Sequence, residues 1–153
     1  MSTEQHDSTP DTLAHIKRVN TLLLQCVHKL LNRAAIHDAS KLVSPEKEGY
    51  DTISVKLKGM KYGTPEYRES LRELQPVIAH HYANNDHHPE HTPQGIAGMN
   101  LLSLTEMLMD WKAATERMDQ GDIRRSLEIN RERFNISPQL EAILQNTIRD
   151  MGW

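Results

Sequence analysis

The sequence predicts an all-α protein that forms a single compact bundle of about six or seven helices. Apolar residues recur at helical spacing in several segments, and no segment alternates apolar and polar residues as a half-buried strand does. Serine or threonine precedes proline at several points, which is the residue order that begins a helix. The chain has 153 residues, enough for one domain with one core.

The first helix is predicted from Thr9 to about Arg33. Thr9 can cap it, Pro10 suits its first helical position, and Asp11 places an acid in its first turn. One face of this helix is apolar and is expected to pack in the core: Ile16, Val19, Leu22, Leu23, Cys26 and Leu30.

A second helix is predicted to start at Ser44-Pro45-Glu46, and a third at Thr64-Pro65-Glu66. Pro76 is expected to kink or divide the third helix, because proline lacks the backbone N–H that the helix needs there. Residues 84–95 are rich in Asn, Asp, His, Pro and Gly, and are expected to form an ordered loop.

The most apolar segment, from about Ile96 to Met118, is predicted to be the central helix, which Gly121 ends. Two shorter helices are predicted after it, over residues 122–134 and 138–151. Ser137 is expected to cap the last of them.

The overall composition excludes several classes of function. The net charge is -3, so no basic field points to a nucleic-acid polymer. No apolar run approaches the roughly 18 residues of a membrane span. Residues 1–9 are expected to form a flexible tail without a signal-peptide core, ahead of one domain over residues 10–153. The single cysteine, Cys26, rules out an internal disulfide, so a cytoplasmic location is expected.

Histidine and aspartate residues indicate a metal site around the doublet His37-Asp38. A nitrogen donor beside an oxygen donor suits Mn, Fe, Co, Ni or Zn. With about 100° per helical residue, His15 falls beside the apolar face of the first helix, His81 points inward and His80 is turned away. Asp110 lies among apolar neighbours on the central helix, where an unpaired carboxylate is costly to bury.

Each of these residues also has a simpler interpretation. A single inward histidine is usually a hydrogen-bonded core residue. Asp110 could pair with Arg117 or Lys112, and the histidine-rich loop could be a solvated turn. Their joint occurrence favours a metal site, because so many partly buried polar groups would otherwise be expensive.

The order of these residues resembles the HD-domain phosphohydrolase superfamily, whose helical fold carries the pattern H…HD…D, here His15, His37-Asp38 and Asp110. The string HDASK is similar to the HDxxK of the HD-GYP branch. His81 and the run His87-His88-Pro89-Glu90 resemble that branch's further histidines, which bind a second metal. The strings HDASK, HYANNDHHPE and DWKAA are also similar to a small group of stand-alone HD-like proteins. This resemblance implies an HD-domain-like bundle.

The resemblance implies one or two divalent ions, drawn from Mn, Fe, Co, Ni, Zn and Mg. The ligands of the first would be His15, His37, Asp38 and Asp110. The second would be held by His81 and by His87 or His88, with Asp38 as the bridge. Which of His80, His81, His87 and His88 bind metal stays open at this point.

The implied function is a metal-dependent phosphohydrolase, a nucleotidase or phosphodiesterase, that cleaves a phosphate ester of a nucleotide or similar small molecule with metal-activated water. Asp38 would be catalytic as the bridge, Lys41 would hold a phosphate oxygen as a point charge, and Glu90 would transfer protons. Lys41 and Glu90 could instead be solvated surface residues.

Two other functions suit the same residues. One is a di-iron oxygenase of the HD type, and the other is a non-catalytic protein that binds or sequesters a nucleotide. The last helix and Trp153 could pack against a second copy of the chain, which would make a homo-oligomer.

Overall fold

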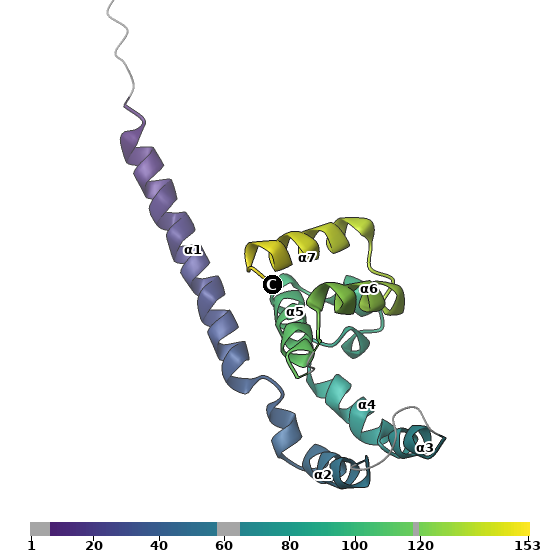
Figure 1. Ribbon diagram of the computed structural model, residues 1–153. Helices are drawn as coiled ribbons and strands as arrows, with labels where there is room; N and C mark the ends of the chain where they lie inside the picture. Colours follow the sequence, from purple (N-terminus) through teal and green to yellow (C-terminus); the bar gives the residue numbers. More distant parts are fainter. Residues whose placement is uncertain (1–6, 58–64, 118–119) are drawn as a thin grey trace, which may run out of the picture. The chain divides into compact units, whose positions relative to one another are not determined.

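The computed structural model describes residues 7–57, 65–117 and 120–153. Within these ranges the chain contains seven α-helices, three short 3₁₀ helices and no strand, which confirms the predicted all-α class. The α-helices are α1 (Thr9–Ile36), α2 (Glu46–Leu57), α3 (Pro65–Glu73), α4 (Gln75–Asn84), α5 (Leu101–Thr115), α6 (Ile123–Arg133) and α7 (Pro138–Asp150), and the 3₁₀ helices are η1 (Ala39–Leu42), η2 (Pro89–His91) and η3 (Gly95–Gly98) (Figure 1).

The chain divides into two units, Met1–Ile36 and His37–Trp153. The described part of the first unit is the single long helix α1, with a short lead-in from residue 7. At the start of this helix the Asp7 carboxylate accepts a hydrogen bond from the backbone N–H of Thr9 at 2.9 Å. The predicted tail includes residues 1–6, which lie outside the described ranges.

No residue of α1 is buried, and among the described residues of this unit nothing covers the apolar face of the helix, which includes Cys26. Two expectations therefore stay predictions: that this face packs in the core, and that residues 10–153 form one domain. Across the described ranges, no helix combines the length and the apolarity that crossing a membrane requires.

In the second unit, α2, α3 and α4 pack against one another. Ile53 of α2 and Leu74, at the break between α3 and α4, are buried. Gly49 lets α2 and α4 approach closely, since a Cβ at this position would lie 2.4 Å from Val77 Cγ2. The break at Leu74 confirms that Pro76 divides the third predicted helix, because Pro76 falls in the first turn of α4, where its missing N–H costs nothing.

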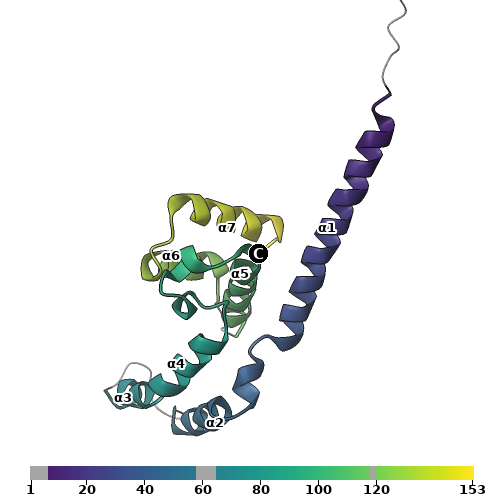
Figure 2. The same cartoon turned by 180° about the vertical axis from the view of Figure 1, so that it is seen from behind.

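The hydrophobic core of the second unit lies among α5, α6 and α7, which pack together in both views (Figures 1 and 2). Trp111 and Phe134 stack at its edge, with ring centroids 6.1 Å apart. Complete burial of an aliphatic side chain contributes about 1.5–3 kcal/mol, so this cluster is the main source of stability for the unit. Its buried members are Leu108, Ile123, Leu127, Ile136, Leu144 and Ile148.

The central helix α5 begins later than predicted. Asn100 caps it by accepting hydrogen bonds from the N–H groups of Leu102 and Ser103 at 2.9 and 3.0 Å. Ile96, the predicted start, belongs instead to the separate 3₁₀ helix η3. The predicted end at Met118 lies outside the described residues.

The two last helices follow the prediction closely. The side chain of Asp122 caps α6 by accepting from the N–H of Arg124, and Ser137 caps α7 by accepting from the N–H of Leu140. Gly152, with φ 73°, follows the end of α7, where a left-handed residue is favourable for glycine.

Candidate metal centre

Asp38 lies in a turn that directs its carboxylate toward residues from several elements. It is the residue before η1 and has φ 54° and ψ 17°, in the left-handed region that few residues other than glycine adopt. Its backbone C=O accepts from the N–H of Lys41 at 2.9 Å. Strained backbone of this kind is concentrated at functional sites, where the surrounding structure holds it in place.

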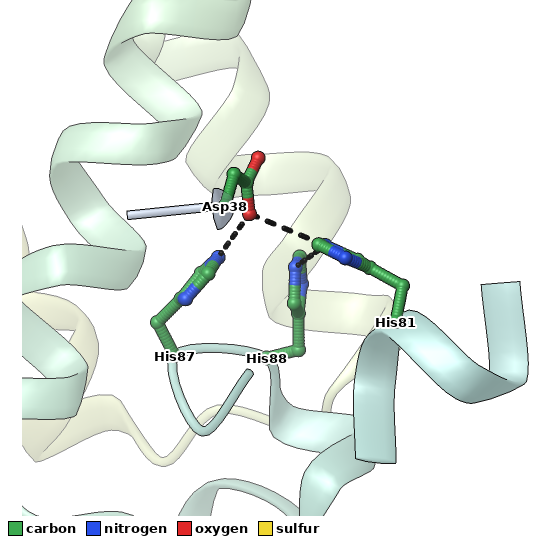
Figure 3. Close-up of side chains that lie close together, drawn as sticks. All are labelled: Asp38, His81, His87 and His88. Carbon is green, nitrogen blue, oxygen red and sulfur yellow. Dashed lines mark hydrogen bonds and ion pairs between the residues drawn. The ribbon is translucent and has the colours of Figure 1, made fainter. Parts of the chain in front are cut away.

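One oxygen of this carboxylate contacts two histidines, and a third histidine lies beside them. Asp38 Oδ1 lies 3.3 Å from His81 Nε2 and 3.4 Å from His87 Nε2. His88 Nε2 lies 2.9 Å from His81 Nε2. Figure 3 shows these side chains converging, with His81 from α4 and the other two histidines from the loop that follows it. These four residues are called the three-histidine group below.

The other oxygen faces a smaller set of side chains. Asp38 Oδ2 lies 3.6 Å from His37 Nε2, which in turn lies 3.8 Å from Asp110 Oδ1 on α5. These three residues, called the His37 group below, also have donor atoms close enough to share an ion. Lys41 Nζ donates to the same Asp38 Oδ2 at 2.6 Å. Asp38 therefore belongs to both groups.

Two glutamates contact the outer nitrogens of these histidines. Glu46 Oε2 lies 2.8 Å from His81 Nδ1, and Glu106 Oε1 lies 2.7 Å from His37 Nδ1 and 3.2 Å from His87 Nδ1. An ionised carboxylate only accepts hydrogen bonds, so a hydrogen bond to Glu46 or Glu106 requires the hydrogen on Nδ1. In the neutral ring the Nε2 lone pair then points inward, which is the form that binds metal.

Glu46 is the centre of a buried network that fixes His81. It has no exposed surface, and its carboxylate also contacts His80 Nδ1 at 2.8 Å and accepts from Ser40 Oγ at 2.9 Å. Asn85 Nδ2 donates to Ser40 Oγ and to the backbone oxygen of His81, both at 2.8 Å. Asn85 therefore ties Ser40 to the residue one turn before it in the sequence.

The polar atoms of the three-histidine group are better satisfied by a shared divalent ion than by hydrogen bonds to one another. Asp38 Oδ1 and His87 Nε2 are buried and have no hydrogen-bond partner among the described residues. A lone pair on Nε2 against a carboxylate oxygen is repulsive unless a cation lies between them. Ligands about 2.1 Å from a common ion are separated by about 3.0–3.4 Å. Three of the separations in the three-histidine group are 2.9, 3.3 and 3.4 Å, and all four donor atoms lie within 4.8 Å of one another.

The pKa shifts in this group favour the protonation states that bind a cation, namely an ionised Asp38 and a neutral His88. Burial favours the neutral form of Asp38, but His81, His87 and Lys41 outweigh it and hold its pKa well below the ordinary range. Burial, followed by repulsion from His87 and His81, lowers the pKa of His88 to about 3, so this imidazole is neutral at pH 7. Burial, followed by the nearby carboxylates of Glu46 and Asp38, raises the pKa of Tyr50 to about 12.

The structure brings together six of the seven predicted ligands: His37, Asp38, His81, His87, His88 and Asp110. His80 contacts Glu46 and lies outside the group, as its helical phase predicted. His15 lies on α1, in the other unit, so its ligand role stays a prediction. Glu90 accepts from Arg133 Nη2 at 2.6 Å and is not brought into either group, so its catalytic role also stays a prediction.

Sequence reasoning missed Glu46 and Glu106. Glu46 was noted only as part of a helix start, where an acid is usually solvated. Glu106 lies four residues before Asp110 and therefore on the same face of α5, so the helical phase that selected Asp110 also indicates Glu106.

Residues 4–150 of the chain match a family of unknown function (DUF5662). No curated protein and no solved structure matches the chain significantly.

Proposed function

The chain belongs to this family of unknown function, and we propose that it is a metal-dependent phosphohydrolase that cleaves a phosphate ester of a nucleotide or a similar small molecule. The observation that carries the proposal is the carboxylate of Asp38, whose two oxygens each face a different set of donor atoms. A carboxylate in this position suits the bridge of a two-ion site, and two-ion sites are common in phosphate-ester hydrolysis.

The donor atoms favour particular ions. One ion would be held by Asp38, His81, His87 and His88, and the second by the His37 group. Imidazole nitrogens mixed with carboxylate oxygens suit Mn, Fe, Co, Ni or Zn, whereas Mg prefers oxygen ligands and keeps several waters. When bound, such ions lower the pKa of a coordinated water and draw negative charge from a phosphoryl group.

Lys41 is the residue of this chain best suited to hold the substrate phosphate. Its ammonium lies beside Asp38 and 5.5 Å from the centroid of the Tyr50 ring, and its side chain is 37% exposed. It is therefore close to the donor atoms and accessible from solvent. A lysine of this kind binds a phosphate oxygen as a point charge and neutralises part of its developing charge.

Turnover on a panel of phosphate esters tests the proposal. Metal-free protein is reloaded separately with Mn, Co, Zn or Mg, and release of phosphate or nucleoside is measured from nucleoside mono-, di- and triphosphates and from phosphodiesters. We expect at least one substrate to turn over with one of the metals and none with metal-free protein. Stoichiometric metal without turnover of any of these esters contradicts the proposal.

A di-iron oxygenase is the second candidate, because three imidazoles around one carboxylate oxygen also suit iron. Aerobic purification separates the two candidates. Iron as the main metal, together with oxygen consumption and no phosphate release, favours the oxygenase. Tight nucleotide binding without any turnover favours a protein that only binds or sequesters its ligand.

A further inference from the structure

A single oxygen of Glu106, Oε1, contacts one histidine from each group. It lies on α5, one turn before Asp110, and its side chain is 13% exposed. His37 belongs to the His37 group and His87 to the three-histidine group, and their ring centroids are 4.6 Å apart. One carboxylate oxygen can accept two hydrogen bonds, so Glu106 can hold both rings at once.

The donor atoms of Glu106, His37 and His87 are also close enough together to share an ion, but the shorter of the two contacts has the length of a hydrogen bond that Glu106 accepts. The 2.7 Å between Glu106 Oε1 and His37 Nδ1 is a charge-assisted hydrogen-bond length. It is shorter than the roughly 3.0 Å that separates neighbouring ligands of one ion. The Nε2 atoms of both rings face Asp38 instead.

We propose that Glu106 is a shared positioning residue that orients His37 and His87 together and so couples metal binding at the two groups. This inference rests on the metal-binding part of the proposed function. When His87 Nε2 is coordinated, its Nδ1–H becomes a stronger donor to Glu106. The carboxylate is then fixed in the position in which it also accepts a hydrogen bond from His37. Less conformational entropy is lost when an ion binds the His37 group, so binding there is favoured.

Glu46 provides an internal comparison. It contacts His81 and His80, and of these only His81 belongs to a metal group, the three-histidine group. Loss of its charge should therefore weaken one binding step, whereas loss of the Glu106 charge should weaken both. A carboxylate that supports a metal-bound histidine typically contributes 10–100-fold to metal affinity.

Cobalt titration of metal-free protein tests this inference. Binding is followed by calorimetry and by the visible absorption of Co²⁺, and the ions are counted by elemental analysis. We expect the wild type to bind two ions with positive coupling of about 5–150-fold. Glu106→Gln should lose about 10–100-fold at both steps, together with the coupling, while Glu46→Gln loses affinity at one step. The matched control Glu116→Gln, at the C-terminal cap of the same helix and paired with Lys112, should bind as the wild type does.

A second measurement needs no variant. Long-range ¹H–¹⁵N correlation of the metal-loaded wild type reports which ring nitrogen of each histidine carries hydrogen. We expect Nδ1–H for both His37 and His87. Nε2–H in either ring, or affinity of Glu106→Gln within twofold of the wild type at either step, overturns the inference.

Failure of this inference and failure of the proposed function give different results. If wild-type protein binds two Co²⁺ ions but hydrolyses no phosphate ester, the proposed phosphohydrolase activity is contradicted. The titration of Glu106→Gln then decides the role of Glu106 independently. Wild-type protein that binds only one ion overturns the coupling. Protein that binds none overturns both.

Discussion

Asp38 combines three properties that rarely occur in one residue: left-handed backbone, a carboxylate shared by two groups of donor atoms, and an ion pair with Lys41. The left-handed conformation costs most residues roughly 1–2 kcal/mol, and less for aspartate or asparagine. The turn therefore accepts few residue types, and its conformation places the carboxylate against His81 of α4 and against His37.

Asp38→Asn should separate metal binding from folding. Asparagine adopts the left-handed conformation at least as well as aspartate, so the turn should be kept. The amide has no negative charge, and metal affinity should fall at least 100-fold at both groups. Metal content after gel filtration measures the loss, with Asp51→Asn on the exposed face of α2 as the control. A variant that retains stoichiometric metal would contradict the role of Asp38 as a shared ligand.

His88 should make the metal-free protein sensitive to mild acid. Its folded pKa is about 3, whereas in the unfolded chain an ordinary histidine has a pKa near 6.5. As the pH falls below 6.5, the unfolded chain binds a proton that the folded chain does not. Stability from the neutral ring is therefore present above pH 6.5 and is lost progressively toward pH 3.

Chelated wild type and His88→Gln can be compared by urea unfolding at pH 7 and pH 5. Between these values the wild type should lose about 1–2 kcal/mol more stability than the variant. The exposed His91, which contacts only the backbone oxygen of Tyr82 among the bonds described, supplies the control His91→Gln. Equal pH dependence in wild type and His88→Gln would show that His88 is not held neutral by the fold.

Residue-scale prediction from sequence succeeded where a helix supplied a period. The phase of α4 distinguished His81 from His80, and the phase of α5 identified Asp110. His87 and His88 lie in a loop without such a period, so the sequence alone left their roles open. Their convergence on Asp38 depends on the tertiary packing of α4 against η1 and α2.

At the scale of elements, α5 carries more of the site than any other helix, since both Glu106 and Asp110 project from it. Its start was predicted at Ile96 because the apolar pattern continues unbroken through η3. The actual start depends on Asn100, a cap that is not followed by proline, unlike the starts predicted at Thr9, Ser44 and Thr64. Ser103, in the first turn of α5, donates to Asp86 Oδ2 at 3.0 Å and so ties the helix to the histidine loop.

Asn100→Ala should therefore destabilise the second unit through one helix end. The variant loses the acceptor for two backbone N–H groups, which costs about 1 kcal/mol. The urea midpoint should fall without a change in the slope of the transition, because the surface exposed on unfolding is unchanged. Asn100→Asp retains an acceptor at the same position and should keep the wild-type midpoint. A midpoint for Asn100→Ala equal to that of Asn100→Asp would contradict the cap.

At the scale of the whole molecule, the hydrophobic core and the metal groups occupy different parts of the second unit. The core lies among α5, α6 and α7. The donor atoms come instead from the two residues before η1, from α4 and its loop, and from α5. Buried polar atoms without hydrogen-bond partners, such as Asp38 Oδ1 and His87 Nε2, lose the free energy of hydration. A bound ion would offset that loss.

Metal removal should therefore lower the melting temperature of the wild type. An ion that binds only the folded state at 100 times its Kd adds about 2.7 kcal/mol to the free energy of unfolding. For a chain of about 150 residues this corresponds to a shift of roughly 5–10 °C. Scanning calorimetry with and without a chelator measures the shift, and reloading with Co²⁺ or Mn²⁺ should restore it. Asp38→Asn should melt at one temperature in both conditions, because it has lost the shared ligand. A chelator-dependent shift of equal size in that variant would place the stabilising ion elsewhere in the chain.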